Sequence, residues 1–547
     1  ASLSYSSYET VETALYVSGG HGPVAADIAI YNRDQGRGFG HNLNTGVEES
    51  RLKETAIRAS LAWEISPNDK LRLPADWGDN RSDMGLARRN YPGSILIGNV
   101  TGLGGRYDTR SSYPARQLNS DYWGGSARYR HGMDNGEIVL LSAFRNTLLV
   151  YQFDQESTPA RLADVTITQQ TKTWQNEALV NADFGRLHLT TGAFVFKATS
   201  RFYPQSIRSA TPASNFDVYS RQRTTSYAAF AQITFDLTDA TRLTAGGRYT
   251  VDRRRFNGVR RAAAGHPSGA GAVLIGPRAD KTKASEPTWR ISIDHDLAEQ
   301  VMIYASYNRG FKSGSYNLTD ITAAPVNPET LDAFEAGFKS QLASYLRLNG
   351  SAFHYKYKDI QLQRQAGTAQ VFLNAGSGRI NGGELELTLA PPVPVGALTL
   401  TSAVSVLDAK YTYFPSGPFS VPNATGGNTN QARDLAGFTM IRSPKWTLAA
   451  GGTYSVPVGS GDLSVNVNYY YNDGFFWDPD NRLRQRPYDV VNAQVAFTFG
   501  EEGRYKARVF GTNLGDTGYF TAATAGSLGD IVSYAPPRMY GVGLEVA

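Results

Sequence analysis

The chain has 547 residues, including 55 Gly, 31 Tyr, 25 Phe and no Cys, and its formal net charge is +5. The absence of Cys excludes a disulfide framework, a Cys-ligated metal site and a cysteine nucleophile, and no run of 18 apolar residues is present to form a membrane-spanning helix. So small a net charge on so long a chain gives no indication of nucleic-acid binding, and Ala1 opens directly on an alternating segment, which predicts that a signal peptide is either absent or already removed.

Apolar and polar residues alternate along most of the chain with the period of two that is typical of a half-buried β-strand. The pattern is clear in residues 55–65, 226–237, 242–252, 289–294 and 463–472. The helical period of 3.6 residues is almost never seen. The sequence therefore predicts an all-β protein whose strands have one apolar and one polar face.

Short turns alternate along the chain with long polar segments. The short turns carry the Gly, Asn, Asp and Pro residues that favour tight turns. The long segments are rich in Gly, Arg and Ser and span residues 36–52, 80–118, 151–168, 202–220, 257–284, 413–437 and 516–534. The strands of the predicted sheet are therefore joined by short turns at one end and by long loops at the other.

This alternation predicts 22 strands. They cover residues 1–6, 11–19, 24–35, 53–66, 70–79, 119–132, 136–150, 169–182, 186–201, 221–237, 241–256, 285–296, 300–312, 329–343, 345–361, 371–390, 395–412, 438–457, 461–475, 486–500, 503–515 and 535–547. An even number places both termini on the short-turn side, as in single-chain outer-membrane barrels.

Two physical facts favour a membrane barrel over a soluble β-propeller or β-helix. A sheet in lipid must pair all its backbone polar groups, so it must close on itself. The many aromatic residues near predicted strand ends suit the two interfacial girdles of such a barrel, and no blade-sized repeat is visible. The expected fold is one domain, residues 1–547: a 22-stranded antiparallel transmembrane β-barrel with short periplasmic turns and long extracellular loops.

Five short motifs, in order along the whole chain, resemble the barrel domain of TonB-dependent outer-membrane receptors. They are ASLSYSSYET at 1–10, GRYTVD at 247–252, EAGFK at 335–339, NLGD at 513–516 and PRMYG at 537–541. The resemblance implies a receptor in the bacterial outer membrane that imports a scarce nutrient with energy delivered through periplasmic TonB. Members of this family begin with a coupling segment and a globular plug that fills the barrel.

The chain starts where the first barrel strand of such a receptor would start, and no plug, coupling box or signal peptide is expected within it. We expect TonB to act through an N-terminal plug segment that is missing from this chain. A 22-stranded barrel has a lumen too wide to be filled by its own side chains. Six charged residues are therefore expected to line the lumen and face a plug or water: Arg58, Arg248, Arg290, Asp294, Glu335 and Lys339.

The sequence does not predict an enzyme, and it indicates neither a metal site nor a cofactor. The seven histidines are far apart and show no metal-binding spacing. The Ser and Asp residues form no recognisable nucleophile motif.

Two of the long segments are basic. Residues 80–118 contain six Arg, Arg116 among them, against two Asp, and residues 257–284 contain five Lys or Arg against one Asp. Arginine recognises carboxylate and phosphate through paired hydrogen bonds. With nearby aromatic residues, these arginines form a candidate site for an anionic, partly aromatic ligand such as a ferric chelate: Arg88, Arg89, Tyr91, Arg106, Tyr107, Phe202, Tyr203, Arg260, Arg261, Phe476 and Trp477. The alternative is that the arginines bind lipopolysaccharide phosphates or keep the loops soluble.

The leading hypothesis is uptake of a ferric siderophore. Uptake of a glycan, a vitamin or an aromatic acid is compatible with the same loops, and a passive porin-like channel or a surface binding protein remains an alternative. The expected partners are outer-membrane lipid, lipopolysaccharide, TonB and a small molecule or metal chelate, without nucleic acid.

Overall fold

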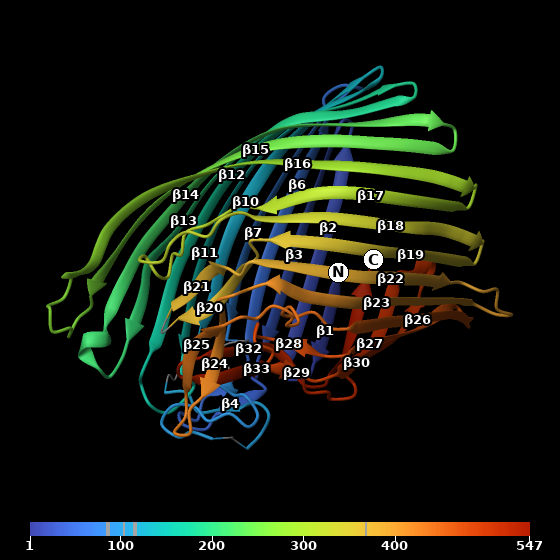
Figure 1. The fold of residues 1–547 in the computed structure, drawn as a ribbon. Coiled ribbons are helices and arrows are strands. Elements are labelled where there is room, and N and C mark those ends of the chain that lie inside the picture. Colours follow the sequence, from blue (N-terminus) through green and yellow to red (C-terminus); the bar gives the residue numbers. More distant parts are fainter. Residues whose placement is uncertain (84–87, 102–103, 113–116, 367–368) are drawn as a thin grey trace.

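The computed structural model is a closed antiparallel barrel of 22 strands (Figure 1). It describes residues 1–83, 88–101, 104–112, 117–366 and 369–547. The barrel strands are β1 (Ser2–Ser6), β2 (Thr10–His21), β3 (Val24–Gln35), β6 (Leu52–Glu64), β7 (Asp69–Ser82), β10 (Gln117–Met133), β11 (Gly136–Asp154), β12 (Asp164–Phe184), β13 (Leu187–Arg208), β14 (Phe216–Thr238), β15 (Thr241–Ala262), β16 (Val273–Ala298), β17 (Val301–Lys312), β18 (Glu329–Ala343), β19 (Leu346–Lys358), β22 (Ser377–Leu389), β23 (Ala397–Tyr413), β26 (Trp446–Val458), β27 (Gly461–Asn472), β30 (Tyr488–Phe499), β31 (Tyr505–Thr512) and β34 (Met539–Val546). The predicted strand number and fold are confirmed.

The first and last strands close the barrel. Strand β1 pairs with β34 over five residues, from Ser2 opposite Glu545 to Ser6 opposite Gly541. The amino group of Ala1 donates a hydrogen bond to the carbonyl of Val546 at 2.6 Å, so the two chain ends lie side by side at the short-turn end (Figure 1). Closure leaves no sheet edge with unpaired backbone groups in the lipid.

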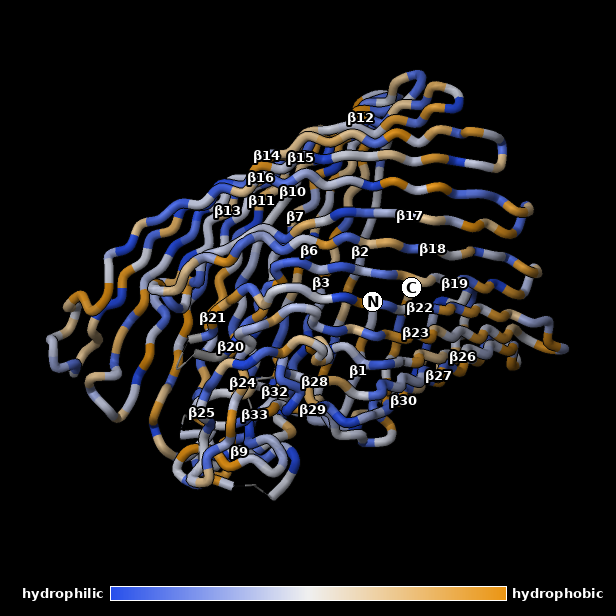
Figure 2. Tube along the Cα trace, viewed as in Figure 1, coloured by the Kyte–Doolittle hydropathy of each residue, from blue (hydrophilic) through white to orange (hydrophobic). Residues whose placement is uncertain are grey.

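Apolar side chains lie on the outer face of the wall and polar ones on the inner face. Ile57, Leu61 and Trp63 of β6 are exposed on the outside, whereas Arg58 and Ser60 alternate with them. The same alternation of hydropathy runs along the other strands (Figure 2). An exposed apolar exterior is stable in lipid and not in water, so the wall is built for a membrane.

The wall is uneven in height. Strands β11 to β16 have 19 to 26 residues, whereas β31 and β34 have eight and β1 has five. A tilted strand needs about 9 to 11 residues to cross the hydrocarbon layer. The wall therefore rises far above the membrane at β11–β16, and we call this part the high wall. It ends low at the seam between β31, β34 and β1.

Three of the loops expected from the sequence were placed wrongly. Much of 151–168, 202–220 and 257–284 is strand, because β11 to β16 continue pairing after their alternating pattern ends. Above the lipid the outer face of these strands meets water, so regular alternation of apolar and polar residues no longer marks them clearly, although part of the inner face is buried in apolar clusters. Long loops that were not expected as such join β17 to β18, β19 to β22, and β27 to β30.

The strand expected at 438–457 begins only at Trp446. Phe438, Met440 and Ile441 pack instead against a buried cluster formed by Ile360, Leu362, Ala375, Tyr411, Phe414 and Leu435. The predicted strand at 371–390 is likewise divided into β21 (Ala369–Asn374) and β22 by Gly376, whose φ is +89°. Apolar alternation alone does not distinguish a barrel strand from a loop that covers a small core.

Two short 3-10 turns, Pro212–Ser214 and Glu501–Gly503, are the only helical elements in the described ranges. No helix in those ranges is long and apolar enough to cross a membrane.

The closure can be tested with cysteines, since the chain has none of its own. Tyr5 and Val542 are direct partners across the seam, so in Y5C/V542C the two thiols lie within disulfide range. We expect mild oxidation to produce a chain that migrates as a more compact species in denaturing, non-reducing gels. The matched control, Y5C/L544C, joins diagonal positions and should cross-link much less; equal cross-linking of both pairs would contradict the register.

Candidate functional site

The loops at the long-loop end are joined by backbone pairing. Strand β8 (Arg89–Asn90) pairs with β33 (Gly529–Tyr534), which also pairs with β32 (Phe520–Gly526). The loop between β23 and β26 adds a hydrogen bond from Gly427 N to the Ile95 carbonyl at 3.0 Å. Loops that are hundreds of residues apart in the sequence therefore form one layer, as their grouping in Figure 1 shows.

Asp530 is the centre of this layer. Its carboxylate is almost fully buried and accepts two hydrogen bonds from the guanidinium of Arg482, at 2.5 and 2.7 Å. It also accepts from the Asn428 amide at 2.8 Å and from the Ser94 hydroxyl at 3.2 Å. These four residues come from four different loops, so we call them the loop clasp. A buried carboxylate with one charged and two neutral donors is a strongly directional junction.

Aromatic rings form a chain beside the clasp. Neighbouring ring centroids lie 4.9 to 6.2 Å apart in the order Tyr8, Phe39, Tyr107, Tyr534, Phe520 and Tyr91. The Tyr107 hydroxyl donates to the Ala535 carbonyl at 3.1 Å. Edge and tilted contacts between rings at these separations are stabilising. The ring chain therefore gives the loops a rigid apolar support.

A cavity of about 250 Å³ opens along this ring chain. Its lining includes the rings of Phe39, Tyr107 and Tyr534 and the side chains of Arg89 and Arg106. We call it the rim cavity. The sequence predicted Arg89, Arg106 and Tyr107 as ligand-binding residues, and the structure brings these three together, with Tyr91 in the adjoining ring chain.

The arginines of the rim cavity also have partners in the loops. Arg106 donates to the Asp516 carbonyl at 3.0 Å and lies 3.8 Å from the Asp516 carboxylate. Arg89 donates to the Gly105 carbonyl. These contacts orient the two cations at the wall of the cavity, beside its aromatic rings. Asp108 contributes a carboxylate to the same lining.

The other predicted ligand residues lie elsewhere. Phe202 is buried in an apolar cluster with Val165, Ile167 and Ile207, and Arg88 stacks 4.5 Å over Phe153 at the edge of that cluster. The remaining residues of this group also have partners on the high wall: Arg201 stacks over Tyr203, Arg260 stacks over Phe216, and Arg261 donates to the Gly271 carbonyl. These contacts stabilise the high wall, away from the residues that line the rim cavity.

Phe476 and Trp477 lie in the loop between β27 and β30, which carries Arg482 of the clasp. Arg484 stacks over Phe476 and Arg442 over Trp477. The Tyr91 hydroxyl contacts Arg484, donating to its carbonyl at 3.2 Å. These two aromatic residues are thus linked to the layer but do not line the rim cavity. Arg116 lies outside the described residues.

Five of the six predicted lumen residues have an exposed apolar neighbour in the chain, and Lys339 has the same parity as Glu335 on β18, so all six have the parity of the inner face. Arg248 lies 5.2 and 5.5 Å over the rings of Phe194 and Phe230, and Glu335 accepts a hydrogen bond from Tyr304 at 2.7 Å. Lys339 lies over the same Tyr304 ring. No ion pair of Arg58, Arg290 or Asp294 occurs among the described residues.

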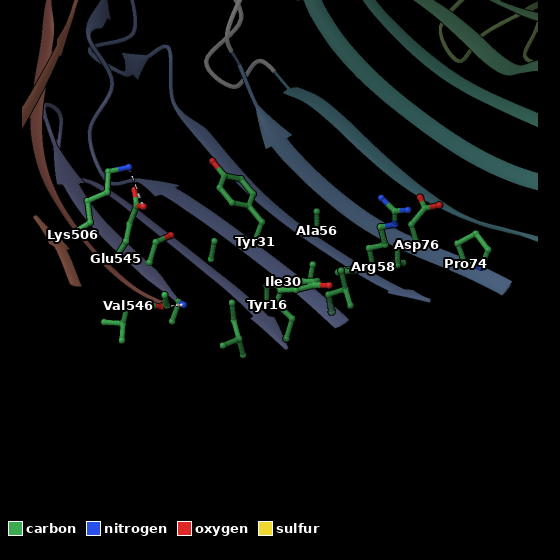
Figure 3. Close-up of a pocket in the computed structure, with 18 of the residues that line it drawn as sticks. Tyr16, Ile30, Tyr31, Ala56, Arg58, Pro74, Asp76, Lys506, Glu545 and Val546 are labelled. Carbon is green, nitrogen blue, oxygen red and sulfur yellow. Dashed lines mark hydrogen bonds and ion pairs between the residues drawn. The ribbon is translucent and has the colours of Figure 1, made fainter. Parts of the chain in front are cut away.

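The inner wall is hollowed close to the chain termini (Figure 3). This cavity of about 1000 Å³ is lined in part by Tyr16, Tyr31, Arg58, Asp76 and Glu545. Asp76 pairs with Arg145 at 2.8 Å and Glu545 with Lys506 at 3.4 Å. The cavity thus has charged pairs at its edges, whereas most of its lining is apolar and includes Ala29, Ile30 and Ala56.

Sequence reasoning missed the loop clasp. Asp530, Arg482, Asn428 and Ser94 are ordinary polar loop residues in the sequence, and no spacing relates them. Phe39 and Tyr534 of the rim cavity were missed for the same reason. Within the described ranges, no group of three or more His, Asp or Glu residues is arranged to hold a metal ion.

Comparison with known proteins identifies the family. The model of the TonB dependent receptor-like, beta-barrel family matches residues 60–514. The chain belongs to this family. It is therefore an outer-membrane receptor protein, and the long-loop end is extracellular.

Solved receptors share the fold at low sequence identity. The ferric yersiniabactin uptake receptor FyuA from Yersinia pestis is 16% identical with a TM-score of 0.81, and the match covers 100% of this chain and 79% of FyuA. The siderophore receptor PiuA from Acinetobacter baumannii is 16% identical (TM-score 0.76; 100% and 80% covered). The ferric-catecholate import receptor Fiu from E. coli K12, in its closed form, is 15% identical (TM-score 0.75; 100% and 81% covered).

The first prediction for this receptor concerns the clasp. D530N removes the charge that holds Arg482, and breaking a buried pair costs about 3–5 kcal/mol. We expect amide exchange in residues 473–487 and 89–97 to accelerate by the factor that this loss of free energy implies. Exchange in the barrel strands should not change. R482Q should act similarly, and R482Q/D530N should cost less than the sum of the single changes, because the two residues interact directly. Purely additive effects would show that the pair does not hold the loops.

The second prediction concerns pH. Burial, with the neighbouring Asp480, raises the pKa of the Asp478 carboxyl to about 7. Asp478 lies in the loop between β27 and β30, which also carries Arg482 of the loop clasp. Since the pKa of this group is about 3.9 in the unfolded chain, its stabilising contribution is full below about pH 4 and is lost as the pH rises through about 7. We expect amide protection in 473–487, corrected for intrinsic exchange, to be lower at pH 8 than at pH 6.

D478N should remove this pH dependence, because the neutral amide can still accept the hydrogen bonds from the Arg482 and Leu483 backbone N–H groups. The control is E501Q, which neutralises an exposed carboxylate at the short-turn end. A pH profile of D478N equal to that of the unchanged protein would show that another group titrates.

Proposed function

We propose that this receptor binds a ferric siderophore at its extracellular loops and imports it to the periplasm with energy delivered through TonB. The observation that carries the proposal is the rim cavity, in which Arg89 and Arg106 lie beside the rings of Phe39, Tyr107 and Tyr534. Guanidinium and aromatic groups side by side suit a ligand that is both anionic and aromatic, such as a catecholate chelate. FyuA is a ferric yersiniabactin uptake receptor, PiuA a siderophore receptor and Fiu a ferric-catecholate import receptor, which supports a ferric chelate as the ligand class.

The size of the cavity limits what it can hold. At about 250 Å³ it is smaller than the roughly 300–1,000 Å³ of sites that enclose a whole drug-sized ligand. It fits one aromatic arm of a chelate, with the rest of the ligand lying on the loop layer. The same volume suits a single-ring aromatic acid, which is the second candidate substrate.

Binding measurements on the purified receptor separate the two candidates. Titrations would compare a ferric catecholate, a ferric hydroxamate and a simple aromatic acid. We expect R106Q to weaken the anionic ligand that binds by tenfold or more, because a hydrogen bond to a charged group contributes about 1.5–3 kcal/mol. The matched control is R110Q, which removes a charge from an exposed arginine of the same loop that does not line the cavity.

Tight binding of the aromatic acid alone would replace the siderophore with the second candidate. Equal effects of R106Q and R110Q would move the site away from the rim cavity. Growth under iron limitation, with and without the gene and with each chelate supplied, then tests the role in cells.

Coupling to TonB belongs to the same proposal. In the working receptor, a plug domain seated against the charged inner wall would close the lumen until TonB displaces it. Uptake should therefore stop in cells that lack TonB. Continued uptake in such cells would favour a passive channel.

A further inference from the structure

The outer face of the high wall carries a group of cations that form no ion pair within the described part of the chain. Three neighbouring strands present Arg221 and Arg223 (β14), Arg253 and Arg255 (β15), and Lys281 and Lys283 (β16). These residues share the outward parity of Tyr227 and Tyr249, which are exposed on the outside of the same strands. We call the six residues the cation belt.

The strand register places like charges directly opposite each other. Arg223 is the partner of Arg255, Arg255 of Lys281, and Arg253 of Lys283. Like charges in directly opposed positions destabilise a sheet. Among the described residues no carboxylate forms an ion pair with any of the six. The wall thus carries repulsion that a bound anion would relieve.

The inner face of the same strands is different. Arg278 pairs with Asp280 at 3.0 Å there, and Asp252 is buried on that face opposite Ser226. Acidic residues are therefore present on the inner face of these strands, whereas Asp217, which has the outward parity on β14, pairs with Arg208 at 2.8 Å rather than with any of the six cations. The excess of positive charge is specific to the outer face.

The position of the cation belt relative to the membrane follows from the residues below it. On the same face, Ile233, Leu243, Ile291 and Ile293 are exposed toward the lipid, and Tyr249 follows them at the level of an interfacial girdle. Arg253 lies four residues beyond Tyr249. At about 3.4 Å per residue and a tilt near 45°, this is roughly 10 Å higher, which is where the head groups of the outer leaflet lie.

We propose that the cation belt binds the phosphate groups of lipopolysaccharide, the phosphorylated glycolipid of the outer leaflet. Arginine pairs with phosphate through two parallel hydrogen bonds, and lysine supplies additional point charges. A second copy of this chain is not a suitable occupant, because two faces of one sign would repel each other. The belt is formed by different residues from the rim cavity, so the proposal is independent of the substrate.

The binding of lipopolysaccharide has two consequences for the receptor. It relieves the repulsion between β14, β15 and β16, so the upper part of the high wall becomes more stable. It also anchors the wall at a fixed height in the outer leaflet.

The test uses the full chain purified in detergent and purified lipopolysaccharide as the probe, with binding followed by native mass spectrometry and titration calorimetry. In R223Q/R253Q/R255Q/K283Q we expect binding to weaken by at least tenfold. The matched control, K70Q/R186Q/R347Q/R504Q, removes the same number of charges at the short-turn end and should bind as the unchanged receptor does. Retention of the folded electrophoretic form on gels run without heating shows that each variant is intact.

Two further measurements identify the ligand chemistry. Lipopolysaccharide freed of its phosphates should bind at least tenfold more weakly to the unchanged receptor. R223K/R253K/R255K keeps the charge, should fold even where the Gln variant does not, and should bind more weakly than the unchanged receptor because lysine lacks the paired geometry.

The proposal is overturned if the belt variant binds lipopolysaccharide as the unchanged receptor does. Equal losses in the belt and control variants would also overturn it, since they would indicate a general charge effect. Undiminished binding of the dephosphorylated lipid would exclude phosphate as the recognised group, and inorganic polyphosphate binding as tightly as lipopolysaccharide would exclude recognition of the lipid.

Discussion

The requirement that every backbone donor and acceptor in lipid be paired governs the whole molecule. It explains why β1, although it has only five residues, pairs along its full length with β34, because an unpaired edge there would cost several kcal/mol per exposed group. Closure also fixes which residues of each strand face the lipid and which face the lumen. Once the apolar residues of one strand face lipid, the cross-strand register places those of the next on the same side. The charged lining of the lumen and the cation belt both follow from that arrangement.

The loop layer obeys a different rule. It lies in water, so pairing is not obligatory, and its order depends on a few buried polar contacts rather than on continuous ladders. Asp530 joins three other loops through charged and neutral hydrogen bonds. Such junctions are cooperative, because removing one partner leaves a buried group without its donor or acceptor. The loop layer is therefore stabilised as a unit, whereas the barrel beneath it is held by continuous backbone ladders.

The sequence predicted the wall well and the extracellular layer poorly, and the reason is physical. Lipid imposes a strict alternation, so residues such as Arg58 and Arg248 could be assigned to a face from their position alone. Above the lipid, residues such as Arg253 and Lys283 remain in paired strands, but apolar residues do not alternate with them in the sequence. Long-range contacts such as Arg482 with Asp530 depend on loops 48 residues apart and have no local signal. Three of the eleven predicted ligand residues line one cavity, while Phe202 proved to be a packing residue.

The unequal height of the wall gives the receptor a direction. Strands β14 to β16 are long and belong to the high wall on one side of the barrel, whereas the seam strands β31, β34 and β1 on the other side are short. The loops that build the rim cavity extend from strands at or near this seam. A diffusing molecule therefore meets strands over one sector of the mouth and the loop layer over the opposite sector. The two sides of the mouth thus differ in what holds them together: continuous backbone ladders on one side and a few side-chain junctions on the other.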